Sequence, residues 1–297
     1  MAQTLRLGAF TPSVLLRVAR RLGRLEQAGL EVVETLVPSS PAQFRSLLDG
    51  TFDAVLTSPD NVLARRYLGA RADIKILSAV DRGLGLALYS GKTDLRGATL
   101  AVDVPASGFA FAMYALAESL GLARDGYEVV ALGSTPRRLA ALLAGECDAT
   151  MLNAGNELHA EAAGLHRLAR VGDVCRPYLG TVLAAVDPEP VRALAAALTS
   201  TAETIAGWDT RAVRPDSLEA RLDSLVVREA GAALELPRGL AVRYLARLRS
   251  PGEGLVTDGI VDPAALRTLV DLRRRYGPAA EGDRLAAALE SDPGLLA

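Results

Sequence analysis

Residues 40–61 read SPAQFRSLLDGTFDAVLTSPDN, and residues 135–156 read TPRRLAALLAGECDATMLNAGN. The two segments align without a gap at a constant offset of 95 residues, and they share a hydroxyl residue before proline, a Leu-Leu pair, a Gly, an Asp-Ala pair and a final Asn. Each copy is typical of a capped helix, a glycine turn, a short apolar strand and a polar loop. A long period that occurs twice excludes a solenoid, which needs three or more short repeats. It predicts two similar α/β lobes whose equivalent loops face one cleft.

The segments around this repeat alternate between strand-like and helix-like patterns at the spacing of βαβ units. In the N-terminal part of the chain, the strand-like segments are 5–10, 30–37, 52–57 and 74–80. The alternation predicts a mostly parallel sheet covered by helices, with the strand-to-helix loops at one edge of the sheet. Two extended segments flanked by glycine, 84–89 and 179–186, are expected to cross between the lobes.

The predicted lobes are interwoven in the sequence. No low-complexity linker interrupts the chain, and the second copy of the repeat lies between the two crossing segments. We therefore expect an α/β fold with mostly parallel sheets and two crossover strands. Residues 1–86 and 185–297 are expected to form a discontinuous first lobe, and residues 87–184 the second lobe.

The composition is that of a globular protein without a polyanionic partner. The chain has 297 residues, of which 50% are hydrophobic and 23% are charged, and its net charge is −2. This charge supplies neither a basic field for nucleic acid nor a polybasic patch for anionic lipid. No apolar run approaches the ~20 residues of a membrane span. We expect a small-molecule ligand, no nucleic-acid partner, no membrane insertion and a monomer.

The N-terminus enters the first predicted strand directly. Residues 1–4 contain no basic n-region, apolar h-region or small-residue cleavage site of a secretory leader. As written, the chain is expected in the cytoplasm. If a leader has been removed, the protein is expected in the periplasm or outside the cell.

Hydroxyl-proline pairs stand where predicted strands give way to helices. These pairs are Thr11-Pro12, Ser40-Pro41, Ser58-Pro59 and Thr135-Pro136. The hydroxyl caps free backbone N–H groups, and proline at the first helical position loses no hydrogen bond. One interpretation is capping alone. The other is a binding site, because helix N-termini that meet at one sheet edge attract an anionic or strongly polar group.

Other residues near the predicted cleft also have two interpretations. Ser107-Gly108 opens a helix in the same way, and Phe109 beside it is either a stacking wall for a ligand or part of the lobe core. Arg82, at the end of a predicted strand, is either a fixed positive charge for a carboxylate or sulfonate or an exposed surface arginine.

Histidines and cysteines, the residue types typical of zinc sites, are few in this sequence. His159 and His166 are the only histidines, lie on a predicted surface helix and have no third ligand nearby, so no metal site is expected. Cys147 and Cys175 fit no zinc spacing. Cys147 is expected to be a small buried hydrophobe, and a bridge between the two cysteines stays open.

Catalytic motifs are also missing. The sequence has no Gly-x-Ser-x-Gly nucleophile elbow, no Walker loop and no Rossmann glycine fingerprint, and no cofactor is expected. Asp60, Asp81 and Glu157 are acids in loops that face the predicted cleft, but nothing in the sequence pairs them as acid and base. The balance favours binding over catalysis.

Four segments carry a resemblance to a known family: 5–10 followed by Thr-Pro, FDAV at 52–55, DLRGATLAV at 94–102, and DGIVDP at 258–263. In order and spacing they resemble the nitrate/sulfonate/taurine-type solute-binding proteins of ABC importers, to which thiamine-pyrimidine precursor-binding proteins and synthases are related. The resemblance covers about residues 4–276. It implies a type II periplasmic-binding fold whose two lobes close on a ligand at a hinge, with an ABC permease as the partner in import.

Loop by loop, the resemblance implies a set of ligand-binding residues. They are Thr11, Ser40, Ser58, Asn61, Arg82, Ser107, Phe109, Asn153 and Asn156. Hydroxyls, amides and helix N-termini supply many hydrogen-bond donors and few charges. The expected ligand is therefore a small polar organic molecule with an anionic or hydrogen-bond-accepting group, and with a modest flat or apolar part against Phe109.

Two features depart from the family's pattern and leave a second function open. A binding protein of an importer is secreted, yet the sequence shows no leader, and the cysteine-rich motif of the thiamine-pyrimidine synthases is absent. Cytoplasmic relatives on this fold include decarboxylases and dehydratases of small carboxylic acids. The alternative is therefore a cytoplasmic lyase of that kind, while the scarcity of catalytic groups favours the binding protein.

Overall fold

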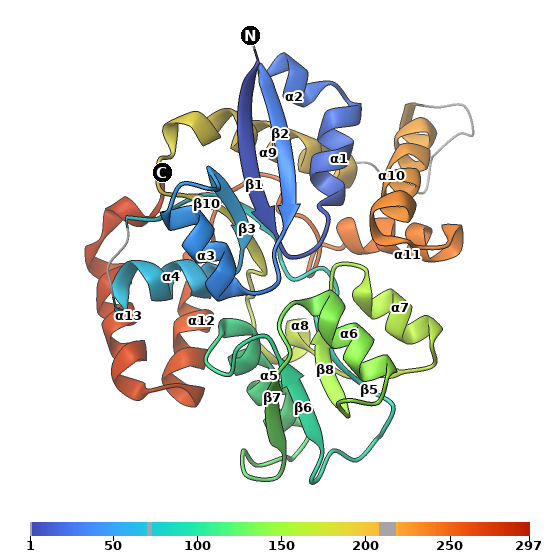
Figure 1. Ribbon diagram of the computed structural model, residues 1–297, viewed down its shortest axis with the longest axis vertical. Coiled ribbons are helices and arrows are strands. Elements are labelled where there is room, and N and C mark those ends of the chain that lie inside the picture. The colour runs from blue at the N-terminus through green and yellow to red at the C-terminus, as the bar shows by residue number, and fades with distance from the viewer. Residues whose placement is uncertain (1, 70–72, 208–217) are drawn as a thin grey trace.

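Two five-stranded β-sheets, each with helices on both faces, form the two lobes of the molecule (Figure 1). The computed structural model describes residues 2–69, 73–207 and 218–297. We call the first sheet and the helices packed on it the first lobe, and the second sheet with its helices the second lobe. The first lobe lies in the upper part of Figure 1 and the second lobe in the lower part.

The first sheet combines four strands from the N-terminal part of the chain with one from its middle. The strands are β1 (Gln3–Ala9), β2 (Leu30–Leu36), β3 (Ala54–Thr57), β4 (Lys75–Asp81) and β10 (Thr181–Ala185). Their order is β2-β1-β3-β10-β4. β1 pairs in parallel with β2 and β3, whereas β10 runs antiparallel to β3 and β4.

The second sheet follows the same plan. Its strands are β5 (Ala87–Ser90), β6 (Thr99–Val102), β7 (Glu128–Ala131), β8 (Ala149–Leu152) and β9 (His166–Arg170). Their order is β7-β6-β8-β5-β9. β6 pairs in parallel with β7 and β8, whereas β5 runs antiparallel to β8 and β9.

In each sheet the one antiparallel strand adjoins a crossing between the lobes. The chain leaves the first sheet after β4 and enters the second as β5, then returns as β10 between β3 and β4. The other four strands of each sheet point the same way, so the sheets are mostly parallel. The expected fold class, α/β with mostly parallel sheets and two crossover strands, is confirmed.

Helices cover both faces of both sheets. One face of the first sheet holds α1 (Val14–Arg21), α2 (Arg24–Gln27), α9 (Arg192–Ala206), α10 (Leu218–Leu234) and α11 (Arg238–Leu248), and the other holds α3 (Ser40–Leu48), α4 (Pro59–Tyr67), α12 (Pro263–Tyr276) and α13 (Ala279–Ser291). The second sheet packs against α5 (Gly108–Ser119) and α8 (Val171–Val174) on one face and α6 (Thr135–Leu143) and α7 (Asn156–Ala162) on the other. Short 3-10 turns lie at Glu189–Val191 and Pro293–Leu295.

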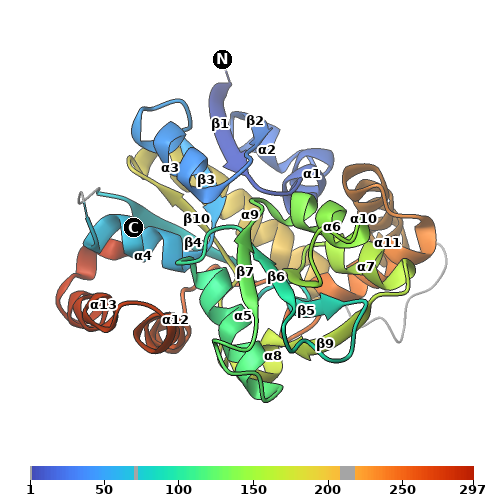
Figure 2. The ribbon, with the colours of Figure 1, turned by 60° about the horizontal axis from the view of Figure 1, so that its bottom comes forward.

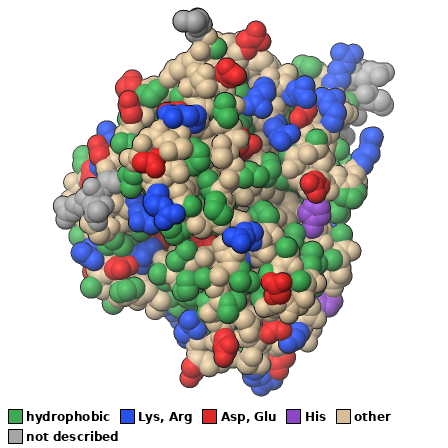
Figure 3. All heavy atoms as spheres, in the orientation of Figure 1, with side chains coloured by type: hydrophobic (Ala, Val, Ile, Leu, Met, Phe, Trp, Pro, Cys, Tyr) green, Lys and Arg blue, Asp and Glu red, His purple; other side chains and the backbone are tan. Residues whose placement is uncertain are grey.

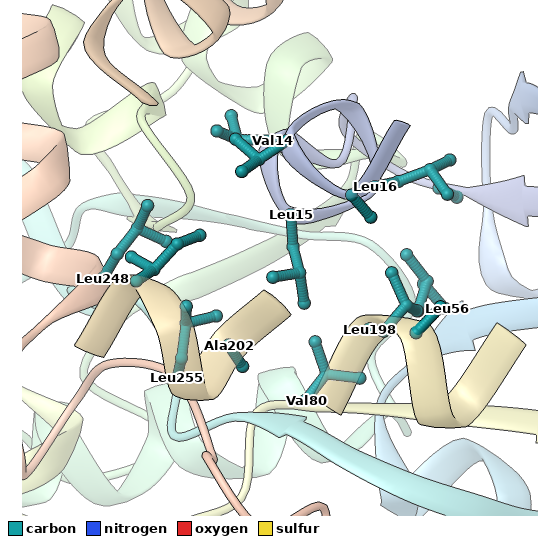
Figure 4. Close-up of a cluster of buried hydrophobic side chains, with 14 of the residues drawn as sticks. Val14, Leu15, Leu16, Leu56, Val80, Leu198, Ala202, Leu248 and Leu255 are labelled. Atoms are coloured by element: carbon teal, nitrogen blue, oxygen red, sulfur yellow. The ribbon is translucent and has the colours of Figure 1, made fainter. Parts of the chain in front are cut away.

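Alternating strand residues supply the cores on the two faces of each sheet. In the first sheet, Leu183 packs toward α1 and α9, while its neighbour Val182 packs toward α4 and α12, as the two-residue period of a strand requires. Figure 4 shows Leu15 of α1 pointing into the first of these cores, near Val80 and Leu198. Burial of such side chains drives folding at ~25 cal/mol per Å² of apolar surface.

The internal repeat has a direct structural counterpart. α3 and α6 have the same bounds at the offset of 95 residues, and so do β3 and β8. β3 lies in the first sheet and β8 in the second. We propose for the folded chain the division expected from the sequence, with residues 1–86 and 185–297 in the first lobe and residues 87–184 in the second.

One helix, α12, serves both lobes. Leu266 and Val270 of α12 lie in the core between the first sheet, α4 and α13, whereas Leu269 and Leu272 lie in the core of the second lobe. Figure 2 shows α12 beside α5 of the second lobe. The helix therefore ties the C-terminal part of the first lobe to the second.

Helix starts differ by one or two residues from the capping prediction. Ser39, not Ser40, caps α3 and accepts a hydrogen bond from the Ala42 N–H at 3.4 Å. Ser13, not Thr11, caps α1 by accepting from the Leu16 N–H. Thr135 is likewise the first helical residue of α6, after Ser134. In α3 and α6 the proline therefore occupies the second helical position, where its missing N–H is also free of an intrahelical partner.

The histidines and cysteines are placed apart from any common site. His159 lies on α7, but His166 begins β9, so the prediction of one surface helix for both was wrong. The apolar and aromatic residues of β5 explain this, because β5 needs a second neighbour and takes β9. Cys147 is buried as expected, and both Cys147 and Cys175 are unbridged.

Charged side chains of both signs are interspersed on the face of the molecule shown in Figure 3. This agrees with the net charge of −2. Within the described ranges, no helix combines the length and the apolar character needed to cross a membrane.

Candidate functional site

A cavity of about 110 Å³ lies between the two lobes. It opens at the carboxyl ends of β1, β3 and β4, where Ala9, Thr57 and Asp81 contribute to its wall, and the second lobe closes it with Phe109 and Asn153. Ligands of open α/β sheets bind at this edge. On this measure one water needs about 10–15 Å³, so the cavity has room for a small organic molecule.

Polar groups of the cavity wall come from both lobes. They belong to Thr11, Ser13, Thr57, Ser58, Asp81, Thr135, Asn153, Thr181 and Tyr244. Hydroxyls and amides thus predominate, and Asp81 is the carboxylate among the wall residues. No lysine or arginine of the described ranges lines this cavity.

Several helices begin at the cavity. α1 starts after Ser13 and α4 after Ser58, and both residues lie in the cavity wall. α6 starts in the second lobe with Thr135, a wall residue as well. Free N–H groups and the positive ends of the helix dipoles favour a negatively polarised group here.

The lobes touch each other at the rim of the cavity. The Ser40 hydroxyl donates a hydrogen bond to Asp103 Oδ2 at 3.3 Å, and the Ser134 N–H donates to the Pro38 carbonyl oxygen at 3.1 Å. A Cβ atom on Gly133 would lie 2.9 Å from that same oxygen, so only glycine permits this approach. The two lobes are therefore in direct contact at this rim.

Ser58 and Asn153 occupy equivalent positions of the repeat and face the same cavity. Ser58 is buried, and its Oγ has no hydrogen-bond partner among the described residues. The Asn153 side-chain NH₂ donates to the Gly83 carbonyl oxygen at 3.1 Å. The unpartnered hydroxyl is a group that a ligand can satisfy, since a buried polar group without a partner is costly.

Asp81 places a carboxyl group on the wall at the end of β4. Its Oδ1 accepts from the Gly83 N–H at 2.7 Å, and a Cβ on Gly180 would lie 2.6 Å from that oxygen. Burial raises the pKa of the Asp81 carboxyl to about 6. Burial also raises the pKa of the Tyr244 hydroxyl, with Glu157 and Asp81 adding to the effect, so this hydroxyl stays protonated and able to donate.

Glu157 lies behind the cavity, at the start of α7. Its Oε2 accepts from the Gly155 N–H at 2.7 Å, while Oε1 is buried without a partner in the described part of the chain. Burial raises the pKa of Glu157 to about 7. Of the three acids that the sequence left unpaired, Asp60 forms an ion pair with Arg273, whereas Asp81 and Glu157 are buried carboxyls that form no salt bridge among the described residues.

The structure brings part of the predicted set together. Thr11, Ser58, Phe109 and Asn153 line the cavity, and Phe109 is half-buried. Asn61 lines an adjoining chamber of about 30 Å³, and its side-chain NH₂ donates to Thr57 Oγ1.

Three predicted residues lie near the cavity without lining it. Ser40 is turned to Asp103 at the rim, and Ser107 caps α5 while its hydroxyl donates to Asp103 Oδ1 at 2.5 Å. The Asn156 side chain donates to the Asn153 carbonyl oxygen at 2.9 Å and so supports the loop that faces the ligand space. Their polar atoms are engaged by the protein because each begins or caps a helix.

Arg82 does not reach the cavity. Its guanidinium donates to the Leu255 carbonyl oxygen at 2.8 Å and lines a different cavity, together with Arg170 and Glu253. Neighbouring residues of an extended segment point to opposite sides. Since Asp81 faces the space between the lobes, Arg82 faces away from it.

Sequence reasoning missed further cavity residues. Tyr244 of α11 and Thr181 of β10 come from the C-terminal half of the chain, where the sequence offered no motif. Arg138, which lines the adjoining chamber, occupies the repeat position of Gln43. The sequence analysis did not single it out, although the difference from Gln43 between the two copies is a signal that could have drawn attention to it.

The described residues contain no group of three or more His, Cys, Asp or Glu side chains arranged to hold a metal ion. The cavity therefore offers hydroxyl, amide and carboxyl groups as its chemistry. It suits recognition of a small polar molecule by hydrogen bonds.

Comparison with known sequences and structures gives a consistent fold. No family model matches the sequence, and no curated protein sequence matches it. The alkanesulfonate-binding protein SsuA from Xanthomonas axonopodis pv. citri, bound to MOPS, matches with a TM-score of 0.71 at 16% identity, over 93% of this chain and 94% of that chain. The periplasmic nitrate-binding protein NrtA from Synechocystis PCC 6803 matches with a TM-score of 0.73 at 12% identity, over 99% and 86%.

A Candida albicans gene product described as having the generic periplasmic binding protein fold matches with a TM-score of 0.73 at 14% identity, over 99% of this chain and 96% of that chain. The three matches cover nearly the whole chain. The chain therefore has the periplasmic-binding-protein fold, as the resemblance of its sequence implied.

Proposed function

We propose that this chain is a solute-binding protein that captures a small polar or anionic organic ligand between its lobes, as the binding component of an ABC importer does. The observation that carries the proposal is the cavity of about 110 Å³ whose hydroxyl and amide groups come from both lobes. Similar folds bind alkanesulfonate and nitrate, in SsuA and NrtA. A ligand that contacts both lobes stabilises the closed state over the open one.

We assign the ligand contacts to residues of both lobes. Thr11, Ser58, Phe109 and Asn153 line the cavity and would contact the ligand directly. Asn61 would act through the adjoining chamber, and Ser40, Ser107 and Asn156 would hold the rim and loops in place. Arg82 has no part in this proposal, because it lines another cavity.

In an import role, the partner is an ABC permease and the protein works outside the cytoplasm as a monomer. A permease gene and an ATPase gene beside the gene for this chain would support import. A biosynthetic cluster in their place would favour catalysis.

One observation favours the alternative, a lyase acting on a small carboxylic acid. Asp81, with its pKa raised to about 6 by burial, lines the cavity together with the Tyr244 side chain. A carboxyl with a pKa near the working pH is suited to proton transfer. The alternative is tested by incubation of the protein with small carboxylic acids, where turnover that is lost in Asp81→Asn would establish it.

Titration calorimetry with a panel of sulfonates, carboxylates, pyrimidines and amines tests the binding proposal. We expect at least one sulfonate or carboxylate to bind, and small-angle scattering to show a smaller radius of gyration with it. Binding of cationic amines alone would contradict the anion preference and make Asp81 the anchor. Binding without any change in radius would contradict hinge closure.

Ser58→Ala gives a sharper test at one atom. The hydroxyl has no protein partner, so its removal should leave the free energy of unfolding unchanged or slightly higher. The same change should weaken the ligand by about 0.5–1.5 kcal/mol. Ser78→Ala is the matched control, because Ser78 is equally buried but its hydroxyl donates to the Ala79 carbonyl oxygen outside the cavity. The control should lose stability and keep the ligand; the reverse pattern would remove Ser58 from the site.

A further inference from the structure

Arg138 is a deeply buried arginine that forms no salt bridge within the described residues; the charge that acts on it is the Asp103 carboxylate in the same chamber. Only 2% of its surface is exposed. Its Nη2 donates to Thr135 Oγ1 at 2.9 Å, but its Nε is buried without a hydrogen-bond partner in the described ranges. None of the ion pairs found among the described residues includes it.

The other arginine that is as deeply buried is fully paired. Arg273 donates to both carboxylate oxygens of Asp60, at 2.9 and 2.6 Å, and to Glu281. Folded proteins rarely bury a charge without such partners, because the loss of hydration is not compensated. Arg138 is therefore an exception, because the Asp103 carboxylate acts on it without a salt bridge and its Nε stays unpartnered among the described residues.

The position of Arg138 places it beside the ligand space. It lines the chamber of about 30 Å³ that holds Asn61 and Asp103. That chamber and the main cavity share Phe10, Phe109 and Thr135 in their walls. The chamber and the main cavity therefore adjoin each other at these three side chains.

The internal repeat shows that a charge is not needed at this position to build the lobe. Gln43 stands at the same position of the first copy, is fully buried, and donates to the carbonyl oxygens of Gly8 and Leu56 at 3.1 and 3.0 Å. A neutral amide therefore holds the same helix against the same strands in the first lobe. The arginine of the second copy is surplus to that structural task.

We infer that Arg138 pairs with a negatively charged oxygen group of the ligand, a carboxylate or a sulfonate, that reaches into the chamber beside the main cavity. The inference rests on the proposed binding function and gives it the cation that Arg82 does not supply. Asp103, held by the Ser40 and Ser107 hydroxyls, lies in the same chamber. It favours a ligand with a hydrogen-bond donor, such as a hydroxyl, next to the charged group.

Matched small probes test the charge at Arg138. Glycolate and its neutral amide glycolamide share the hydroxyl and differ in charge, as methanesulfonate and methanesulfonamide differ in charge without it. Each is titrated by thermal shift into the wild type, Arg138→Gln, Arg138→Lys and Arg137→Gln. The last is the control, because Arg137 is its exposed neighbour and the charge change is the same.

The wild type and Arg137→Gln should bind the anions more tightly than the amides. Arg138→Gln should lose roughly 10- to 100-fold in affinity for the anions and keep its affinity for the amides. Arg138→Lys should retain part of the preference. Equal binding of glycolate by Arg138→Gln and the wild type would overturn the inference and leave the solute-binding proposal standing, and so would a wild type that binds anions and amides alike.

Urea unfolding without any ligand adds a readout independent of ligand choice. Relief of the buried unpaired charge should move the unfolding midpoint of Arg138→Gln above those of the wild type and Arg137→Gln. A midpoint below both would show that Arg138 is a structural residue and would overturn the inference. Failure of the whole calorimetry panel on a stable wild type would instead refute the proposed function, and the inference with it.

Discussion

The two copies of the repeat have the same backbone and different chemistry. α3 and β3 in the first lobe match α6 and β8 in the second, residue for residue in their bounds. The first copy places Gln43 where the second places Arg138. In the first lobe the Gln43 NH₂ group donates to two backbone carbonyl oxygens, whereas in the second the Arg138 guanidinium donates to Thr135 Oγ1 and forms no salt bridge among the described residues. Each side chain also keeps one buried atom without a partner there, Gln43 Oε1 and Arg138 Nε. The two copies thus share one backbone scaffold, while the buried polar residue at this position differs in charge between the lobes.

A second pair of positions shows the same divergence at the junction of the lobes. Asp60 of the first copy is fully buried and paired with Arg273. A Cβ on Gly108, where α5 of the second lobe begins, would lie 2.5 Å from the Asp60 Cβ. The equivalent of Asp60 in the second copy is Gly155, in the left-handed region at φ +96° against Leu234. One copy meets its neighbour with an ion pair, the other with an apolar side chain.

The largest effect is expected from a mutation that removes the ion pair between Arg273 and Asp60 of the first copy. Arg273→Ala leaves Asp60 buried without its ion-pair partner and should lower the free energy of unfolding by about 3–5 kcal/mol, measured by urea titration. Arg273 also donates to the Ala106 carbonyl oxygen in the second lobe, so both lobes lose a contact. Arg274→Ala is the control, since its pairs with Asp271 and Asp283 are exposed and such pairs contribute about 0–1 kcal/mol. Equal losses in the two variants would mean that the buried pair has no special role.

The next expected effect is a pH dependence of stability, which we compare for one buried carboxyl in each lobe, Asp81 and Glu157. Burial raises the pKa of Asp81 to about 6 and that of Glu157 to about 7. The folded state therefore holds protons that the unfolded state releases, and the stability from each carboxyl is present at low pH and lost as pH rises through the folded pKa. For Asp81 the loss from pH 4 to 7 should be about 2 kcal/mol.

Asp81→Asn should flatten the pH dependence of stability between pH 4 and 6, and Glu157→Gln between pH 5 and 7. Unfolding midpoints in urea at a series of pH values measure both. If each variant keeps the wild-type dependence of the unfolding midpoint on pH within its own pH range, the two carboxyls have ordinary pKa values in the folded protein. That result would contradict the expectation that each lobe holds a buried carboxyl with a raised pKa.

The repeat also explains how far the sequence could predict the structure. The α/β class, the crossover strands, and the helix and strand of each repeat copy could be predicted. They depend on the spacing of apolar residues and on turn residues, which are local signals in the sequence. The resemblance implied Thr11, Ser58, Phe109 and Asn153, which line the cavity. Thr11, Ser58 and Asn153 follow the ends of strands, and Phe109 lies in the first turn of α5. Arg82 stands at a strand end as well, but the side of an extended segment on which a residue lies depends on register, which local pattern does not fix.

Other features depend on contacts between distant parts of the chain. Nothing near α12 in the sequence indicates that Leu269 and Leu272 enter the core of the second lobe. The burial of Arg138 is equally invisible, because an arginine four residues into an amphipathic helix ordinarily faces water. Tyr244 joins the cavity through the packing of α11 on the first lobe, a tertiary contact.

The smallest expected effect compares the caps of the two repeat helices. The Ser39 side chain accepts the Ala42 N–H, whereas the Ser134 side chain makes no capping bond. Ser39→Ala should cost about 0.5–1 kcal/mol of unfolding free energy, and Ser134→Ala less than about 0.5 kcal/mol. Melting temperatures of the two variants, measured side by side, should fall in that order. The opposite order would show that the second copy depends on its cap through contacts with the first lobe.

The insertion of β10 between β3 and β4 determines when the protein can be completed during synthesis. The first sheet cannot close until the entire second lobe has left the ribosome, because β10 follows it in the chain. The second lobe in turn gains the side chains of Leu269 and Leu272 only when α12 emerges, close to the C-terminus. Nascent chains that stop short of α12 would therefore present apolar surface to chaperones and proteases. Neither lobe can therefore complete its folding during translation before the other lobe has been synthesised.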